Sequence, residues 1–456
     1  MILERWFHLR EAGTTVRREV TAGLVTFVTL SYILFVQPAM LARTGMDPAG
    51  VLFATCVASA VACFAMAWLA NYPFALAPAM GHNVFFAFTV CGATAMDFAW
   101  PEALAANFLA GTAFLLLARV GVRERVMDAV PDALKYAIAA GIGLLIAMVG
   151  LQWAGIVVDD PGFLVGIGDL GAPTTLLAVF GLAATSVLLV RRVPGAILIG
   201  VLVTGVAGWA ATRILGLEPA LVPLAGVVGA PPSPRATAFR LDFGGLFSRD
   251  VLEIVVVIFT FFVLDLFDTV ATLIGVAERS GLLRDGRLPR ARGAFTADAA
   301  GTVAGALLGT STITSYVESA AGTASGGRTG LVAVVTGICL LASLFFAPLI
   351  QAIGAGVNVG SAAAPLLHYP VIAPVLVLVG VLMMGAVRRI DWDDLSQAIP
   401  AFLAMIAMPL SGSPTEGIAW GFLSWSVLSL LPGRRRTAPP LLHAISLLFV
   451  VYYVVR

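Results

Sequence analysis

The chain has 456 residues, of which 59% are hydrophobic and only 12% are charged, and its formal net charge is +1. A soluble protein carries about a quarter charged residues, so the composition excludes an ordinary soluble protein, and the apolar content excludes intrinsic disorder. Four cysteines in 456 residues exclude a disulfide-rich scaffold. The near-zero net charge gives no reason to expect nucleic acid as a partner. The remaining class is an all-α polytopic membrane protein.

Apolar stretches that could cross about 30 Å of hydrocarbon as helices of about 20 residues recur along the chain. In chain order, the fourteen expected spans, several of them short, are 20–42, 50–70, 72–95, 102–119, 135–157, 173–190, 194–212, 251–277, 294–309, 310–326, 329–351, 371–387, 396–411 and 414–431. One more apolar stretch, 439–455, fits either an extra span or a helix lying on the membrane.

Basic residues gather before the first span and after the fourth, sixth, eighth, tenth, twelfth and fourteenth spans. They are Arg5, Arg10, Arg17, Arg18, Arg119, Arg123, Arg125, Lys135, Arg191, Arg192, Arg279, Arg284, Arg287, Arg290, Arg292, Arg328, Arg388, Arg389 and Arg434 to Arg436. The opposite connections at 156–172 and 352–369 contain none, whereas the long 213–249 connection contains four arginines and departs from the pattern. Short cytoplasmic loops are enriched in Arg and Lys. We therefore expect a cytoplasmic N-terminus in a plasma membrane, the inner membrane of a bacterium.

Two of the expected spans are interrupted at matching places. Residues 72–83 contain two prolines and a glycine, which predicts extended chain to about Pro78 and helix only afterwards. Residues 309–318 are rich in β-branched and hydroxyl side chains, which also favour extended chain before a helix. Asn83 and Glu318 lie 235 positions apart, close to the offset of about 231 between the starts of spans one and eight.

This near-constant offset predicts two seven-span halves, and the second must be inverted because seven is odd. Interrupted segments at matching positions of inverted repeats indicate the midplane site of a transporter. Each half-helix would begin at membrane depth, with free N–H groups and a positive dipole end facing the cavity.

Very few charges fall inside the expected spans. Burying each as an ion costs roughly 2.5–3.5 kcal/mol on insertion scales, so each is a candidate functional residue. The carboxylates at depth, away from the span ends, are Asp265 and Asp268 in span eight, Asp298 in span nine and Glu318 in span ten. One helical face of span eight carries Asp265, Asp268, Thr269 and Thr272, and we expect this polar stripe to line the cavity.

Several of these residues have a structural alternative. Ser315 and Glu318 have the spacing of a capping box, so Glu318 could cap its half-helix. Asp298, near the start of span nine, fits helix-start or packing duty as well as function, and Asn83 fits capping as well as ligand binding. His82, the only histidine inside a span, could be a proton relay or a wall residue.

Motifs spread along the chain resemble one known family. They are Glu11-Ala-Gly-Thr-Thr-Val-Arg-Arg-Glu-Val-Thr-Ala-Gly, Asn71-Tyr-Pro-Phe-Ala-Leu-Ala-Pro, Asp265-Leu-Phe-Asp-Thr, Gly309-Thr-Ser-Thr-Ile-Thr-Ser-Tyr-Val-Glu-Ser-Ala-Ala-Gly, Gly326-Gly-Arg-Thr-Gly-Leu and Ile390-Asp-Trp-Asp-Asp. Over nearly the whole chain, and in order, this set resembles the AzgA-like purine permeases for hypoxanthine, guanine and adenine within the nucleobase/ascorbate transporter superfamily.

The resemblance implies fourteen helices in two inverted repeats, with short antiparallel strands in spans three and ten and a core domain that moves against a gate domain, often in a homodimer. The implied divisions are core (1–120), gate (121–215), an extracytoplasmic loop (216–250), core (251–352), gate (353–432) and a C-terminal basic turn with an apolar helix (433–456).

Position by position, the resemblance makes Asn83, Asp265 and Glu318 purine contacts, and makes Asp268 the second carboxylate of span eight. Thr269, on the same polar stripe, is a further candidate for substrate binding. His82 and Asp298 are secondary candidates. One departure lies beside the expected site: the family's Gly-Met-Gly-Leu-Asn-Ala reads Ala79-Met-Gly-His-Asn-Val here, which leaves the preferred purine open.

The expected function is import of purine nucleobases by proton symport, with Asp265, Asp268 or Glu318 carrying the proton. Carboxylates are strong acceptors for purine N–H groups, and an amide can both donate and accept. Alternatives are uracil, xanthine or an anion such as sulfate on the same architecture, although neither half-helix start has a basic residue before Arg328. An intramembrane enzyme using His82 with Asp265 is conceivable but lacks metal-ligand spacing, so no cofactor, metal or enzymatic activity is expected.

Overall fold

A computed structural model describes residues 2–93, 95–120, 130–162, 164–283, 288–361, 366–431 and 440–455. Part of the expected basic pattern lies outside these residues, namely Arg123, Arg125, Arg284, Arg287 and the basic turn at Arg434 to Arg436.

The first half of the chain is mainly helical. Its helices are α1 (Ile2–Phe7), α2 (Val16–Leu30), α3 (Ile33–Ala42), α4 (Pro48–Leu69), α5 (Met80–Val84), the π-helix η1 (Phe85–Val90), α6 (Trp100–Val120), α8 (Asp132–Trp153), α9 (Pro173–Val190) and α10 (Ala196–Leu215). Its strands are β1 (Leu76–Pro78), β2 (Val157–Asp160) and β3 (Leu164–Ile167), and β2 and β3 form a hairpin.

The second half repeats this order. After η2 (Pro234–Ala236) and α11 (Phe243–Phe247) come α12 (Val251–Arg279), α13 (Ala291–Leu308), α14 (Ser319–Ala324), α15 (Leu331–Ala342), η3 (Ser343–Phe346), α16 (Ala347–Ile353), α17 (Ala373–Met383), η4 (Met384–Arg389), α18 (Leu395–Ser411), α19 (Pro414–Ser429) and α20 (Pro440–Val455). Its strands are β4 (Ile313–Ser315), β5 (Val357–Asn358) and β6 (Leu367–His368).

Eight helical stretches among the described residues are long and apolar enough to cross a membrane. They include α4, α6, α8, α9, α10 and α12, and each of the other expected spans coincides with a shorter or interrupted helix. The expected first span, 20–42, falls within one apolar helical stretch, Val16–Ala42, which is long enough to cross a membrane and is bent at Ser31 and Tyr32 between α2 and α3. The Thr29 and Ser31 hydroxyls donate to carbonyls of the preceding turn at this point, which bends helices.

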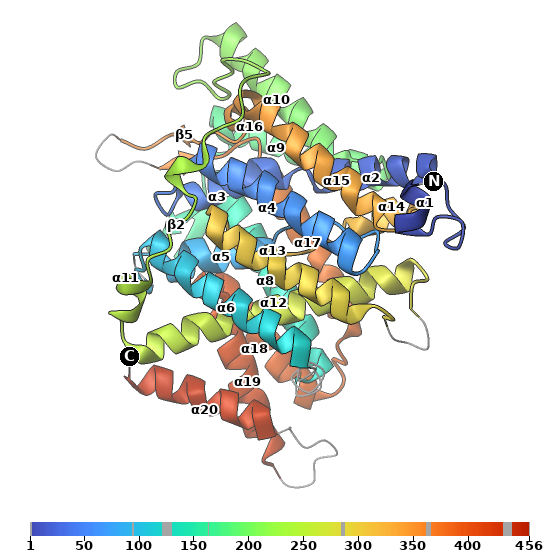
Figure 1. The fold of residues 1–456 in the computed structure, drawn as a ribbon. Coiled ribbons are helices and arrows are strands. Elements are labelled where there is room, and N and C mark those ends of the chain that lie inside the picture. Colours follow the sequence, from blue (N-terminus) through green and yellow to red (C-terminus); the bar gives the residue numbers. More distant parts are fainter. Residues whose placement is uncertain are drawn as a thin grey trace.

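The helices pack in two groups. In one group α15, α4, α13 and α6 lie side by side (Figure 1), flanked by α2 against α15 and by α12 against α6. In the other group α10 packs on α9, α9 on α17, α17 on α8, α8 on α18, α18 on α19 and α19 on α20. The same contacts occur in both halves when each expected span is replaced by its counterpart seven places away. The contact of α2 (span one) with α15 (span eleven) corresponds to that of α12 (span eight) with α6 (span four). The contact of α8 (span five) with α18 (span thirteen) corresponds to that of α17 (span twelve) with α9 (span six). The two-repeat architecture is confirmed.

The two interrupted segments meet at the centre of this arrangement. Strands β1 and β4 pair antiparallel, with Leu76 opposite Ser315 and Pro78 opposite Ile313. Both strands are fully buried. The expected change from extended chain to helix is confirmed in both halves, although the π-helix that continues α5 was not anticipated.

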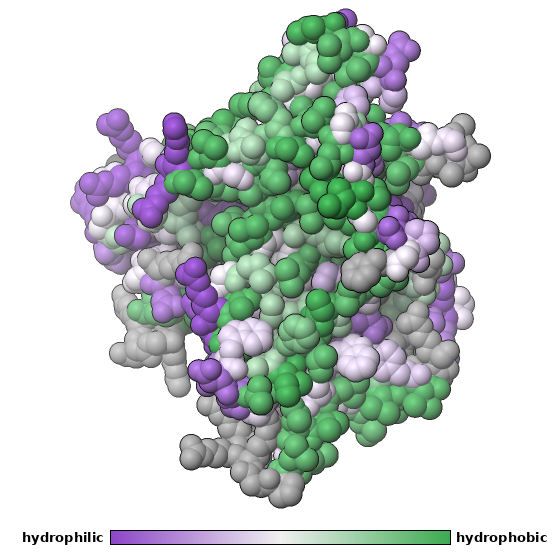
Figure 2. Space-filling model, turned by 180° about the vertical axis from the view of Figure 1, so that it is seen from behind, coloured by the Kyte–Doolittle hydropathy of each residue, from purple (hydrophilic) through white to green (hydrophobic). Residues whose placement is uncertain are grey.

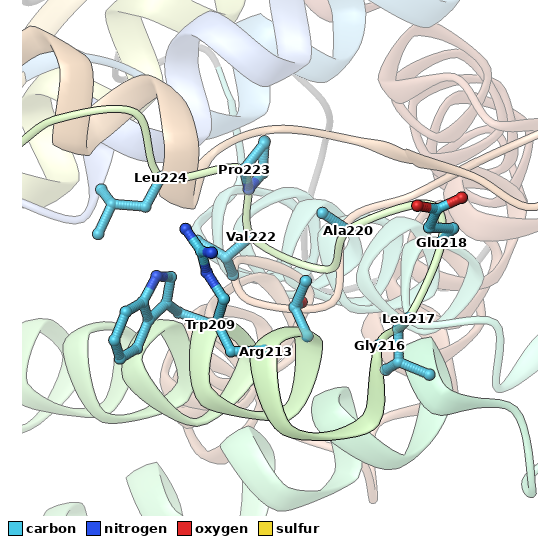
Figure 3. Close-up of a pocket in the computed structure, with 10 residues that line it drawn as sticks. Trp209, Arg213, Gly216, Leu217, Glu218, Ala220, Val222, Pro223 and Leu224 are labelled. Atoms are coloured by element: carbon cyan, nitrogen blue, oxygen red, sulfur yellow. The ribbon is translucent and has the colours of Figure 1, made fainter.

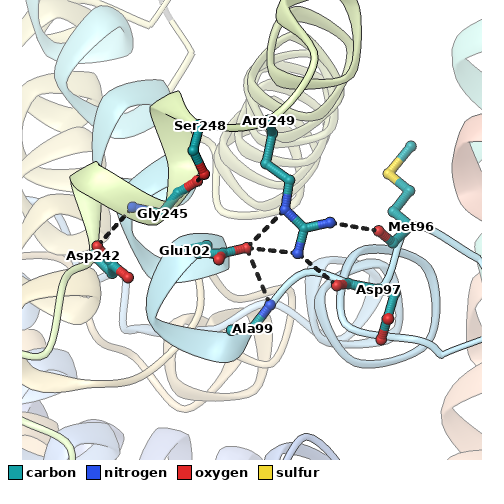
Figure 4. A network of polar contacts seen from close by, with 8 residues as sticks. All are labelled: Met96, Asp97, Ala99, Glu102, Asp242, Gly245, Ser248 and Arg249. Carbon is teal, nitrogen blue, oxygen red and sulfur yellow. Dashed lines mark hydrogen bonds and ion pairs between the residues drawn. The ribbon is translucent and has the colours of Figure 1, made fainter.

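A polar network anchors the exit from the first interrupted segment (Figure 4). Glu102 Oε2, on α6, accepts from Arg249 Nη2 at 2.9 Å and from Arg249 Nε at 3.1 Å. The same guanidinium donates to the carbonyl of Asp97 at 2.7 Å and lies 4.5 Å from the centre of the Phe98 ring. Both donors meet one carboxylate oxygen, and charge-assisted hydrogen bonds of this kind are strong. The network therefore fixes the chain after η1 to the start of α12.

Large apolar side chains cover much of the outer surface (Figure 2). They include Val190, Ile214, Leu430 and Val454, which are between 75% and 83% exposed. A water-exposed surface of this kind is rare, whereas hydrocarbon solvates it well. Together with the long apolar helices, it shows a multi-pass protein in contact with the lipid bilayer.

Candidate functional site

Asn83 lies in α5, just beyond the strand crossing, and is completely buried. Its side-chain amide donates to Gln37 Oε1, and its Oδ1 accepts from the Ser311 hydroxyl. Gln37 in turn donates to the hydroxyls of Thr310 and Ser311, at 2.9 and 3.1 Å. Asn83 is therefore not a helix cap but one member of a side-chain chain that joins α3, α5 and the segment before β4.

Asp298 holds the second strand in place. Its Oδ1 accepts from the backbone N–H of Ser315 at 2.9 Å and from the Thr314 hydroxyl at 3.2 Å, and its Oδ2 accepts from the Thr269 hydroxyl at 2.7 Å. Asp298 is fully buried in the interior of α13. The expectation that it might serve the start of its helix is wrong, because α13 begins at Ala291 and the carboxylate is turned to β4.

Asp265 and Thr269 lie beside Asp298 on α12. Asp265 is 3% exposed, and its carboxylate accepts from the hydroxyls of Thr269 and Thr302 at 3.4 and 3.5 Å. The hydroxyls of Thr269 and Thr314 are 2.8 Å apart, and those of Thr272 and Ser315 are 2.6 Å apart. The polar stripe of span eight therefore faces β4, as its helical spacing predicts.

Glu318 is half-buried at the start of α14, and its Oε1 accepts from the Tyr32 hydroxyl at 2.8 Å. A capping box would require Glu318 to accept from the Ser315 N–H, but that N–H donates to Asp298. No side-chain cap is present at α14. The capping interpretation is wrong, and the carboxylate is turned to the break between α2 and α3.

Asp268 is also half-buried, and its backbone carbonyl accepts from the Thr272 hydroxyl at 2.7 Å. Its carboxylate is close enough to Asp298 and Glu318 for their charges to interact with it. As anions these groups repel one another. The structure therefore brings the four carboxylates at depth, those of Asp265, Asp268, Asp298 and Glu318, into one region.

His82 lies next to Asn83 and is 1% exposed. Neither ring nitrogen makes a hydrogen bond of normal geometry in the described structure, although the backbone carbonyl of Phe261 is nearby. Gly81, the preceding residue, allows α5 to approach α8 closely, because a Cβ at this position would lie 2.8 Å from Ile142 Cγ2.

The expectation of free N–H groups at both half-helix starts is wrong for the second half. The N–H groups of Ser319, Ala320 and Ala321 donate to the carbonyls of the residues three positions earlier, at 2.9–3.1 Å. The backbone N–H groups at the start of the six-residue α14 are thus satisfied within the segment itself. The polar group that the start of α14 presents to its surroundings is the carboxylate of Glu318.

Sequence reasoning missed Gln37 and Tyr32. Both lie in the expected span one, and both reach across to the second half of the chain. The overlooked signal is an uncharged polar side chain in an apolar run, Ile33-Leu-Phe-Val-Gln-Pro-Ala-Met. A search for charges alone does not find such residues.

The site thus combines buried acceptors with a neutral amide pair. Carboxylates at Asp265, Asp268 and Glu318 can accept from the N–H groups of a polar ligand, and the amides of Asn83 and Gln37 can both donate and accept. No group of three or more His, Cys, Asp or Glu side chains that could hold a metal ion is found in the part of the chain that the structure describes. These groups can pair with a small molecule that offers both hydrogen-bond donors and acceptors.

Comparison with known proteins decides the family. The Permease family matches residues 17–418 of the chain. The chain belongs to this family. The permease is 41% identical over 451 residues to the adenine permease AdeP of Escherichia coli strain K12. The alignment covers 99% of this chain and 95% of AdeP. It is also 39% identical over 463 residues to the guanine/hypoxanthine permease PbuG of Bacillus subtilis strain 168, in an alignment that covers 99% of both chains. The resemblance to the AzgA-like purine permeases is confirmed.

A solved structure confirms the fold of the permease. The transmembrane domain of the cyanobacterial bicarbonate transporter BicA superposes with a TM-score of 0.64, covering 87% of this chain and 96% of that one. The two sequences are only 14% identical, so this likeness concerns the fold alone.

Proposed function

We propose that this permease imports purine nucleobases, binding them where the two interrupted segments cross. The observation that carries the proposal is the pairing of β1 with β4, which joins the segments that bear Asn83 and Glu318, and the packing against β4 of α12, which bears the buried Asp265. Full-length relatives named for adenine and for guanine and hypoxanthine support the substrate class.

The chemistry of a purine fits these groups. The ring N–H, and the exocyclic amine where there is one, donate to Glu318 or Asp265, while Asn83 pairs with a ring nitrogen or carbonyl edge. Thr269 lies between two carboxylates, with its hydroxyl 2.7 Å from Asp298 Oδ2 and 3.4 Å from Asp265 Oδ1. A site built to hydrogen-bond its substrate rejects analogues that leave buried groups unpaired. Purines are therefore favoured over small inorganic anions, which carboxylates repel; among the residues that the structure describes, no Arg or Lys forms an ion pair with these carboxylates.

Transport is coupled to protons in this proposal. Asp268 is close to Asp298 and Glu318, so a proton bound on Asp268 or Glu318 removes repulsion between like charges. Protonation lowers the cost of moving the carboxylates through the membrane interior. Release of the proton on the cytoplasmic side then restores the repulsion between the like charges.

The moving part is the helix group that contains α2, α4, α6, α12, α13 and α15, acting as a core against a gate formed by α8, α9, α10, α17, α18 and α19 in an elevator-like motion. The close approach of Gly81 to Ile142 is one sliding contact between the two groups. The family resemblance leads us to propose a homodimer in the bacterial inner membrane. The placement of the arginines leads us to propose a cytoplasmic N-terminus.

Uptake of radiolabelled hypoxanthine, guanine and adenine tests this function, in cells that express the permease and lack their own purine carriers. We expect saturable uptake of at least one purine, competed by unlabelled purines and abolished by a protonophore. Robust uracil, xanthine or sulfate flux without purine uptake would refute the substrate class. Purine uptake that persists under the protonophore would refute proton coupling alone.

A further inference from the structure

A pocket of about 450 Å³ opens at the end of α10, away from the crossing strands. Its walls come from the last two turns of α10 and from the connection that follows, which folds back beside the helix (Figure 3). The residues that line the pocket include Trp209, Arg213, Glu218, Val222 and Leu224.

The pocket carries one positive and one negative side chain. The Arg213 guanidinium lies toward Leu224 and Val222, and Glu218 lies at the opposite end (Figure 3). Neither side chain forms an ion pair with the other or with any other residue that the structure describes. Two opposite charges held apart in one pocket match a ligand that itself carries a separated negative and positive charge.

The surroundings of the pocket belong to a surface that contacts lipid. On α10, Val206 is 65% exposed, Ile214 80% and Leu215 68%. Trp209, 40% exposed, and Arg213 near the helix end are the side chains that typically lie at the membrane–water interface. A ligand in the pocket could therefore extend its apolar part along α10.

We propose that this pocket binds the headgroup of a zwitterionic phospholipid with a primary amine, phosphatidylethanolamine, as a structural lipid of the permease. The phosphate pairs with Arg213, the ammonium group donates to Glu218, and the acyl chains lie against the exposed face of α10. An anionic lipid fits worse because Glu218 repels it, and a trimethylated amine fits worse because it has no N–H to donate to a carboxylate.

Native mass spectrometry of the purified full chain tests the proposal. The protein is presented with equal amounts of phosphatidylethanolamine, phosphatidylcholine and phosphatidylglycerol that have the same acyl chains. We expect phosphatidylethanolamine adducts to exceed the other two about threefold or more, which is the scale of one partly exposed charge pair. Equal retention, or a preference for either other lipid, would overturn the proposal, and this comparison requires no variant.

Variants locate the site. Arg213→Gln and Glu218→Gln should each remove the preference, whereas Arg240→Gln, which changes an exposed arginine on the same long connection, should keep it. A preference that survives both pocket variants would overturn the assignment to this pocket. Soluble glycerophosphoethanolamine, offered as a competitor, should not displace the lipid, and displacement at similar concentration would show a free-headgroup site instead.

Discussion

The two interrupted segments share a backbone plan but differ in chemistry. After β1, the first segment places Asn83, a neutral amide that is completely buried and bonded to Gln37 and Ser311. After β4, the second segment places Glu318, a half-buried carboxylate whose side chain meets the Tyr32 hydroxyl. The two halves of the inverted repeat thus place different chemistry at matching positions: a buried neutral amide in the first half and a half-buried carboxylate in the second.

The second segment depends on a carboxylate anchor, whereas the first is held by neutral groups: the Leu76 N–H donates to Cys63 Sγ at 3.2 Å and the Ala75 N–H donates to Ser319 Oγ at 3.0 Å. Asp298 accepts from the Ser315 N–H and from two threonine hydroxyls, so it ties β4 to α13 and α12. In the first segment the corresponding strand contains Pro78, whose backbone has no N–H to be satisfied. This difference predicts that the second segment is the more vulnerable of the two.

Loss of the anchor should have the largest effect. Asp298→Ala leaves buried donors unpaired, which costs about 1–3 kcal/mol for each group, so we expect a clearly lower melting temperature and a poor yield. Asp169→Ala is the control, because the partner of the Asp169 side chain in the described structure is an exposed backbone N–H, that of Gly171. Thermal unfolding in detergent measures both variants, and equal melting temperatures would show that Asp298 does not anchor β4.

Neutralising the charged half comes next. Glu318→Gln keeps an acceptor for Tyr32 but removes the charge, which is worth roughly 1.5–3 kcal/mol in a charge-assisted hydrogen bond. We expect purine uptake to fall about 10- to 100-fold with the melting temperature preserved. Glu416→Gln is a matched control, because Glu416 also accepts from a tyrosine hydroxyl, that of Tyr453, outside the site. Normal uptake by Glu318→Gln would remove Glu318 from the site.

The division between the two segments shows how far the sequence alone leads. Helix positions, the repeat offset, the strand–helix interruptions and the buried carboxylates follow from apolar run length, proline placement and the cost of buried charge. Gln37 and Tyr32 did not follow, because an uncharged polar side chain in an apolar helix has little cost on its own. The role of Asp298 did not follow either, since its partners are 16, 17 and 29 positions away and only the packed structure brings them together.

Crowding the neutral half should impair movement more than binding. Gly81→Val places side-chain atoms where Ile142 lies, and overpacking of this kind typically costs about 1–3 kcal/mol. We expect uptake to fall about tenfold and Ile142→Ala, combined with Gly81→Val, to restore part of it. Uptake assays of the two single variants and the double variant measure the coupling, and strictly additive losses would separate Gly81 from Ile142.

Cutting the neutral amide chain should have a smaller effect. Gln37→Ala removes one partner of Asn83, and a neutral hydrogen bond contributes about 0.5–1.5 kcal/mol. We expect the apparent purine affinity to weaken about three- to tenfold while maximal uptake changes little. Gln351→Ala, an exposed glutamine on α16, is the control. A loss of maximal uptake with unchanged affinity would instead assign Gln37 to the conformational change.

The smallest effect is expected at His82, which tests whether the neutral half contains a titrating group. Its ring nitrogens are buried without a hydrogen bond of normal geometry, and replacing such a group by an apolar one of similar size is nearly neutral or stabilising. His82→Leu should therefore unfold at the same or a higher temperature and retain uptake within about threefold, since a volume-conserving change is well tolerated. A loss of uptake beyond about tenfold, in a protein that remains folded, would mean that His82 contacts the purine or the proton. The charge of the site would then be divided between both halves rather than concentrated at Glu318 and its neighbours.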